Sequence, residues 1–148
     1  MNPKDEHPNH RPAQKAYVEG KLEVARPLFE SCIAHAEQTG DDSWLTFYLQ
    51  ELAKVEAESG NRQAFDALHQ RAISIYPNAP LLRMFYARDT WTLLKDREAC
   101  LSLITEVEEL VASDRWDKAQ DLAPLAYQQK LETLRAWTRG EEGGPLWP

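Results

Sequence analysis

Two glycines, Gly20 and Gly60, stand forty residues apart, and each separates two stretches in which apolar residues recur with helical spacing. The residues around them align, 16–25 with 56–65. A third copy follows thirty-five residues later, where Lys95 takes the place of the glycine. Repeats of this length are typical of stacked helix pairs, because one pair cannot bury its apolar face alone. We therefore expect an all-α array of antiparallel helix pairs, about three in number, followed by a C-terminal capping helix.

The composition argues against two classes of partner. The 148 residues carry a formal net charge of −7, from 24 acidic and 17 basic residues. Because the basic residues are dispersed, the chain lacks the cationic patch that a phosphate backbone requires, and we expect no nucleic-acid partner. No apolar run approaches the roughly 18 residues of a membrane span, so no membrane partner is expected. With no apolar signal near Met1, and with Cys32 and Cys100 far apart in the sequence, the expected compartment is the reducing cytoplasm.

The chain divides into three expected regions. Residues 1–11 are rich in proline and are expected to be a flexible N-terminal segment, residues 12–139 form the helical domain, and residues 140–148 are a flexible tail. No stretch alternates with a period of two, so no strand is expected. Apolar residues recur at three and four, which predicts helices over 12–20, 22–38, 44–59, 62–76, 81–94, 97–112 and 114–138, the last interrupted just before Pro124.

Small and apolar residues at matching places in the three pairs resemble the tetratricopeptide repeat. Besides the two glycines, the residues that carry the resemblance are Leu22, Ala25, Phe29 and Cys32 in the first pair, Leu49, Leu52, Ala53, Ala72, Pro77 and Asn78 in the second, and Tyr86 and Ala87 in the third. The repeats are degenerate, because Phe65 and Cys100 stand where the family has alanine, and Glu56 and His69 replace aromatic residues. The first spacing is forty residues, against about 34 in the family. The resemblance covers residues 12–112.

In this family the first helix of each pair lines a concave surface. The resemblance therefore implies a lining made of Gln14, Tyr17, Phe47, Gln50, Lys54, Met84, Arg88 and Trp91. Lys54 and Arg88 fall at equivalent places in successive repeats, so they are expected on one wall. Beside Phe47, Met84 and Trp91, this basic pair would hold a peptide that has an acidic group and apolar anchors. In the alternative interpretation, Met84 and Trp91 pack against the last helix, which then fills the groove.

Several side chains suggest chemistry, but for each a structural role is the preferred interpretation. His7 and His10 lie in the proline-rich segment without further ligands, whereas a structural zinc site requires about four. Cys32 and His35 are three residues apart, but Cys32 falls on the buried stripe of its helix. Nothing around Cys32 or Cys100 suggests an activated thiol, and no phosphate-binding loop or nucleophile motif is present. We expect no catalytic residue, no metal and no cofactor.

The sequence thus predicts a protein-interaction module, an adaptor or a chaperone-like protein, that is not an enzyme. Its expected partner is another protein or a peptide with an acidic group. One alternative is a self-assembling homodimer, because four of the five tryptophans would offer an exposed patch: Trp44, Trp116, Trp137 and Trp147. A small hydrolytic or metal-dependent enzyme is the third hypothesis, and it would need a deep pocket that joins a cysteine or carboxylates to a histidine.

Overall fold

The computed structural model describes residues 1–113, 115 and 124–141 of the chain. Within these residues it is all-helical, with seven α-helices, one short 3-10 helix and no strand, which confirms the predicted fold class at that level. The chain forms two compact units, residues Met1–Ile75 and residues Tyr76–Pro148. We call them unit 1 and unit 2.

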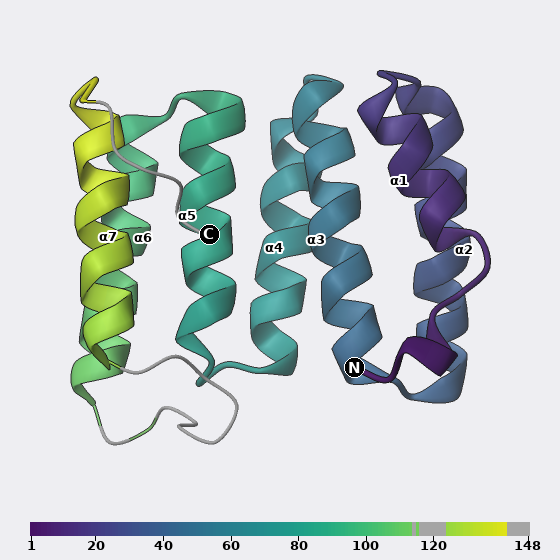
Figure 1. The fold of residues 1–148 in the computed structure, drawn as a ribbon, viewed down its shortest axis with the longest axis horizontal. Helices are drawn as coiled ribbons and strands as arrows, with labels where there is room; N and C mark the ends of the chain where they lie inside the picture. The colour runs from purple at the N-terminus through teal and green to yellow at the C-terminus, as the bar shows by residue number, and fades with distance from the viewer. Residues whose placement is uncertain (114, 116–123, 142–148) are drawn as a thin grey trace. The chain divides into compact units, whose positions relative to one another are not determined.

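Unit 1 contains two helix pairs. Its elements are the 3-10 helix η1 (Pro3–Asp5) and the helices α1 (His10–Val18), α2 (Leu22–Thr39), α3 (Asp42–Glu58) and α4 (Arg62–Ile75). Each helix packs against the next, α1 on α2, α2 on α3 and α3 on α4 (Figure 1). The short turns make consecutive helices antiparallel, so α1 and α3 run in the same direction.

Unit 2 contains the third pair and the last helix. They are α5 (Pro80–Leu94), α6 (Arg97–Ala112) and α7 (Pro124–Thr138). α5 packs against α6, and α7 packs against both of them. α7 begins at the proline where an interruption is predicted, because proline fits the first turn of a helix but not its interior. The helix expected directly before Pro124, and residues 142–148 of the expected tail, lie outside the described residues.

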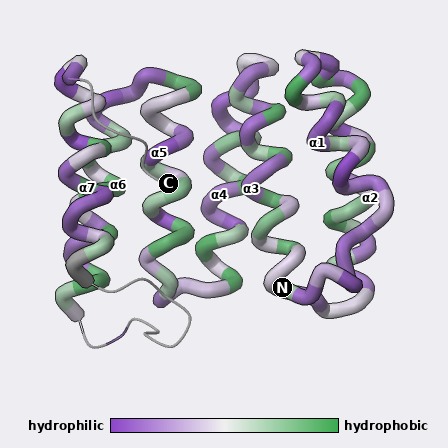
Figure 2. The backbone as a smooth tube through the Cα atoms, in the orientation of Figure 1, coloured by the Kyte–Doolittle hydropathy of each residue, from purple (hydrophilic) through white to green (hydrophobic). Residues whose placement is uncertain are grey.

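The core of unit 1 depends on α3, whose side chains are buried on more than one side. α3 packs against both α2 and α4. By contrast α2 buries one stripe, formed by Ala25, Phe29, Cys32, Ile33 and Ala36. Hydrophobic and hydrophilic residues both occur along each helix (Figure 2). None of the described helices has the length and hydropathy that crossing a bilayer requires.

The repeated glycines close helices. Gly20 and Gly60 have φ angles of 76° and 79°, and Lys95, their counterpart in the third copy, also has a positive φ of 54°. In this left-handed conformation the chain reverses and the next residue donates back to the preceding helix, as Asn61 N–H does to the carbonyl oxygen of Glu56 at 2.8 Å. A residue with a Cβ is strained there, by about 1–2 kcal/mol. The alignment of lysine with glycine in the sequence therefore reflects one shared backbone geometry.

The N-terminal residues are attached to α3 by hydrogen bonds. α1 begins at His10, earlier than the predicted start at residue 12. Upstream of it, the indole Nε1–H of Trp44 donates to the carbonyl oxygen of Asn2 at 2.9 Å, and the backbone N–H of His7 donates to the hydroxyl of Tyr48 at 2.9 Å. Prolines do not prevent such an attachment, because the bonds use donors and acceptors that proline leaves untouched.

Substitution of Lys95 tests the strain at the third turn. Lys95→Gly is expected to exceed Lys95→Ala in free energy of unfolding by about 1 kcal/mol, because only glycine adopts this φ without strain. Both variants lose the contact of the Lys95 ammonium with the Trp91 ring, 5.0 Å from its centroid, so that contact cancels in the comparison. Urea denaturation measures the difference, and equal stabilities of the two variants would contradict the assignment.

Candidate functional site

Four of the predicted partner-binding residues lie in unit 1, on α1 and α3. Tyr17 of α1 and Phe47 of α3 are half-buried and pack against the core, Lys54 is half-exposed, and Gln50 is buried. On α3, residues 47, 50, 51 and 54 follow helical spacing and share one side. We call the surface formed by this side of α3 and by Gln14 and Tyr17 of α1 the α1–α3 face.

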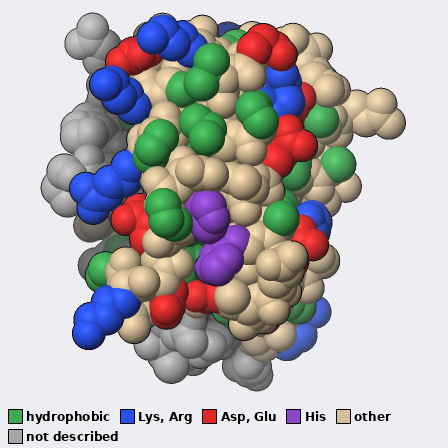
Figure 3. Space-filling model, turned by 90° about the vertical axis from the view of Figure 1, so that its right-hand side faces the viewer, with side chains coloured by type: hydrophobic (Ala, Val, Ile, Leu, Met, Phe, Trp, Pro, Cys, Tyr) green, Lys and Arg blue, Asp and Glu red, His purple; other side chains and the backbone are tan. Residues whose placement is uncertain are grey.

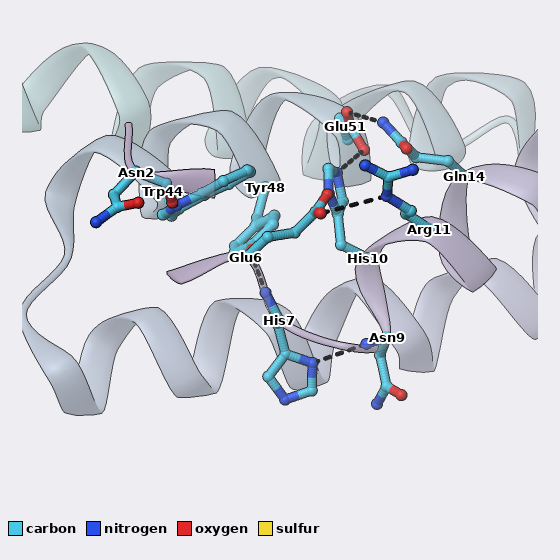
Figure 4. A network of polar contacts seen from close by, with 10 residues as sticks. All are labelled: Asn2, Glu6, His7, Asn9, His10, Arg11, Gln14, Trp44, Tyr48 and Glu51. Carbon is cyan, nitrogen blue, oxygen red and sulfur yellow. Dashed lines mark hydrogen bonds and ion pairs between the residues drawn. The ribbon is translucent and has the colours of Figure 1, made fainter. Parts of the chain in front are cut away.

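A polar network that includes Gln14 and Glu51 of this face joins α1 to α3 (Figure 4). The imidazole of His10 is 2% exposed and lies between two carboxylates. Its Nδ1 is 2.6 Å from Oε2 of Glu6, and its Nε2 is 3.0 Å from Oε2 of Glu51. Gln14 donates its side-chain N–H to the other oxygen of Glu51 at 2.8 Å, and Arg11 donates to Glu6 at 3.3 Å. The network therefore fixes the first turns of α1 against the middle of α3.

Aromatic rings enclose His10. The rings of Phe29, Trp44, Phe47 and Tyr48 have their centroids 5.0–6.3 Å from that of His10. A neutral imidazole carries one N–H, but here both ring nitrogens face carboxylate oxygens. A neutral imidazole can therefore donate to one of these carboxylates, and a protonated imidazole to both. The apolar surroundings strengthen these contacts, since they exclude competing water.

The pKa values of the two carboxylates are shifted in opposite directions. Burial raises the pKa of Glu51 above its usual value, against the opposing effects of His10, Gln14 and Lys54. The hydrogen bond from His10 lowers the pKa of Glu6, and Arg11 adds to this effect. The difference follows from position, because Glu6 is near solvent and Glu51 lies at the buried side of the histidine. Lys54 is thus electrostatically coupled to the network, one helical turn beyond Glu51.

The other three predicted binding residues lie on α5 of unit 2. Met84 is buried, with 1% of its surface exposed, so it presents no anchor to a partner. The guanidinium of Arg88 pairs with the buried carboxylate of Asp89 at 2.9 Å and lies over the ring of Phe85, 4.9 Å from its centroid. Trp91 is half-buried. Arg88 therefore has a structural role within α5, and its charge is already neutralised by an acidic neighbour.

Neither pair of residues considered for a metal site in the sequence, His7 with His10 or Cys32 with His35, is placed to hold an ion together. His10 faces Glu6 and Glu51, whereas the ring of His7 lies 5.0 Å from that of His35 on α2. Cys32 is buried while His35 is exposed, so they do not face one ion. In the part of the chain that the structure describes, no three histidine, cysteine or acidic side chains are placed to hold a metal ion.

The two cysteines are buried and unpaired. Burial raises the pKa of the Cys32 thiol to about 11 and that of the Cys100 thiol to about 12. At neutral pH both are therefore thiols, and the reactive thiolate form is scarce. Their environment suits small apolar core residues, which is the role that the sequence favours for them.

Of the four tryptophans in the homodimer hypothesis, the two that the structure describes are not exposed. Trp44 is buried and stacks on Tyr48, with ring centroids 5.3 Å apart, and Trp137 is half-buried. Trp116 and Trp147 lie outside the described residues. The large apolar side chains that are exposed in the described part are instead Met1, Val18 and Val24.

No protein-family model matches the chain, and comparison with curated proteins and with solved structures finds no match in either.

Sequence reasoning missed Glu51 and Glu6 as partners of His10. For Glu51 a signal exists, since it lies four residues after Phe47 and three before Lys54 on one side of α3. For Glu6 we find none, because its position depends on the path of the N-terminal residues.

Removal of the His10 imidazole should destabilise unit 1. His10→Ala is expected to lower the free energy of unfolding by about 3 kcal/mol, because it leaves two carboxylates without their shared donor. It also removes one of the effects that lower the pKa of Glu51, which then rises further in the folded state. A raised folded pKa gives stability at low pH that is lost as pH rises, so the deficit should be larger at pH 7 than at pH 4.5.

Urea denaturation at the two pH values measures this deficit, with His35→Ala as the control at an exposed histidine of the same unit. A cost for His10→Ala no larger than that of His35→Ala, or one independent of pH, would contradict the role assigned to the network.

Proposed function

We propose that this chain is a tetratricopeptide-like protein-interaction module, an adaptor or chaperone-like protein, which binds a partner peptide through the α1–α3 face of unit 1. The observation that carries the proposal is the combination on this face of half-buried aromatic side chains with a lysine. Tyr17 and Phe47 are packed against the core and keep part of their surface exposed, as binding anchors do. Lys54 supplies the charge.

Rigidity of the face supports this function. Both His10 and Gln14 of α1 contact Glu51 of α3, which fixes the register of the two parallel helices. One turn further along each helix come Tyr17 and Lys54, which are thereby held near one level. A surface that is ordered before binding loses little conformational entropy when a partner arrives.

The charges of the face favour an acidic partner group. Both carboxylate oxygens of Glu51 are engaged within unit 1, one by His10 and the other by Gln14. Lys54 is the basic residue among those that define the face, and its ammonium can pair with a carboxylate or phosphate that a peptide brings. Arg88 is not required for this pairing, because it already has Asp89 as its partner.

Capture from native extract with three matched baits tests the proposal. Wild-type protein is compared with Lys54→Glu, which reverses the charge on the face, and with Lys15→Glu. The control changes the same residue type on α1, where the Lys15 side chain is 78% exposed. Circular dichroism of each bait verifies that the helices are retained, and mass spectrometry identifies the bound proteins.

We expect a partner that binds wild type and Lys15→Glu, and whose binding falls at least tenfold with Lys54→Glu. Loss of one ion pair and the introduction of repulsion at an interface typically have an effect of about that size. A partner held equally by all three baits, or one lost equally with both variants, would refute the assignment of the α1–α3 face.

A further inference from the structure

The N-terminal segment, which we define as residues 2–9, lies against α2 and α3 much as a bound peptide would. Three bonds attach it at separate points. The Trp44 indole donates to Asn2, the His7 backbone N–H donates to Tyr48, and the side-chain amide of Asn9 donates to the hydroxyl of Ser31 at 2.8 Å. Trp44 and Tyr48 belong to α3, and Ser31 belongs to α2, so the segment contacts both helices.

His7 holds the bend that brings this segment into α1. Its Nδ1 accepts the backbone N–H of Asn9 at 3.0 Å, as Figure 4 shows. A ring nitrogen accepts a hydrogen bond only when it carries no proton, so the neutral imidazole has its proton on Nε2. If the ring gains a second proton, the Nδ1–H of His7 faces the backbone N–H of Asn9, and the hydrogen bond between them is lost. The geometry of the bend therefore requires neutral His7.

A second histidine adds to this requirement. His35, on the exposed side of α2, has its ring centroid 5.0 Å from that of His7. Figure 3 shows two adjacent histidine side chains on this face of unit 1, with hydrophobic side chains around them. Positive charges on both rings at this distance would repel each other.

We propose that the N-terminal segment is an acid-sensitive cover of α2 and α3, which protonation of His7 releases so that Trp44 and Tyr48 become accessible. Both of these side chains are buried in the attached state, and their rings are stacked. Release removes the bonds to Asn2 and to the His7 backbone together, because the segment connects the two points. The device acts on the surface beside the α1–α3 face and does not depend on the function proposed for that face.

The groups that face His7 set the direction of the pH dependence. From α2 there is His35 and from α3 the hydroxyl of Tyr48, while His10 and Arg11 of α1 contact the carboxylate of Glu6, the residue before His7. Burial lowers the pKa of His7 below 6.5, and the charge of His35 lowers it further. A histidine with a lowered pKa stabilises the attached state above pH 6.5, and this stabilisation is lost as pH falls below that value.

The two carboxylates of the network do not mimic this behaviour. The pKa of Glu51 is raised in the folded state, so its protonation in mild acid favours the folded state and does not release the segment. The pKa of Glu6 is lowered, so its contribution is lost only below 4.5. Release of the segment between pH 7 and pH 5.5 therefore cannot be attributed to either carboxylate. Protonation of Glu51 would favour the attached state, and Glu6 is protonated only at lower pH.

Amide hydrogen exchange by nuclear magnetic resonance tests the proposal on the full chain. The protection factors of the His7 amide and the Trp44 indole N–H are measured at pH 7.5 and pH 5.5, with correction for the intrinsic pH dependence of exchange. Wild type is expected to lose protection several-fold at the lower pH, at both positions. Two variants accompany it, His7→Asn, whose amide oxygen can accept the Asn9 N–H without titrating, and His35→Gln, which removes the neighbouring charge.

We expect His7→Asn to keep its protection at both pH values, and His35→Gln to move the loss of protection to lower pH than in wild type. Equal protection of wild type at both pH values would overturn the proposal, and so would a His7→Asn variant that loses protection as wild type does. If His7→Asn is unprotected even at pH 7.5, His35→Gln decides the matter, and a pH response identical to that of wild type overturns the proposal.

Discussion

Burial of α3 on more than one side is the constraint on which unit 1 depends. The buried side chains of α2 form a single stripe, whereas those of α3 lie on more than one side, and α3 packs against both α2 and α4. Neither helix pair can therefore exist alone with its apolar surface covered, which is the physical reason that such pairs occur in series. The short turns with left-handed residues follow from the same constraint, because packed antiparallel neighbours leave little length for connections.

The contacts of His10 add specificity to this apolar packing. Hydrophobic stripes determine that α1 lies near α2 and α3, but they do not fix its axial position within a turn. The imidazole of His10 has two nitrogens that face Glu6 and Glu51, and a shift of α1 by one helical turn along α3 would separate it from Glu51. A buried polar network of this kind is costly unless every member has a partner, so it favours one register. That register sets which aromatic and basic side chains lie together on the α1–α3 face.

Much of the fold could be predicted from the sequence, because local signals determine it. The expected limits of α6 agree with the structure at both ends, and Gly20 and Gly60 mark the ends of helix-turn segments because few other residues tolerate their φ angles. The candidate site was harder to predict from the sequence. Met84 was expected to line a groove but is buried, because α5 is apolar on more than one side and helical spacing alone does not tell which side faces solvent. The attachment of residues 2–9 rests on hydrogen bonds between residues about forty positions apart, such as Asn2 and Trp44, for which no local pattern exists.

The most direct test of the account is to locate the bound partner on unit 1. A photoreactive benzoylphenylalanine is placed at Tyr17, on the α1–α3 face, or at its neighbour Val18, which is 82% exposed and points about 100° away around α1. The account predicts that the captured partner is cross-linked from position 17 and not from position 18, although the second side chain is the more accessible. Cross-linking from position 18 alone, or equally from both positions, would show that the partner binds elsewhere and would contradict the account.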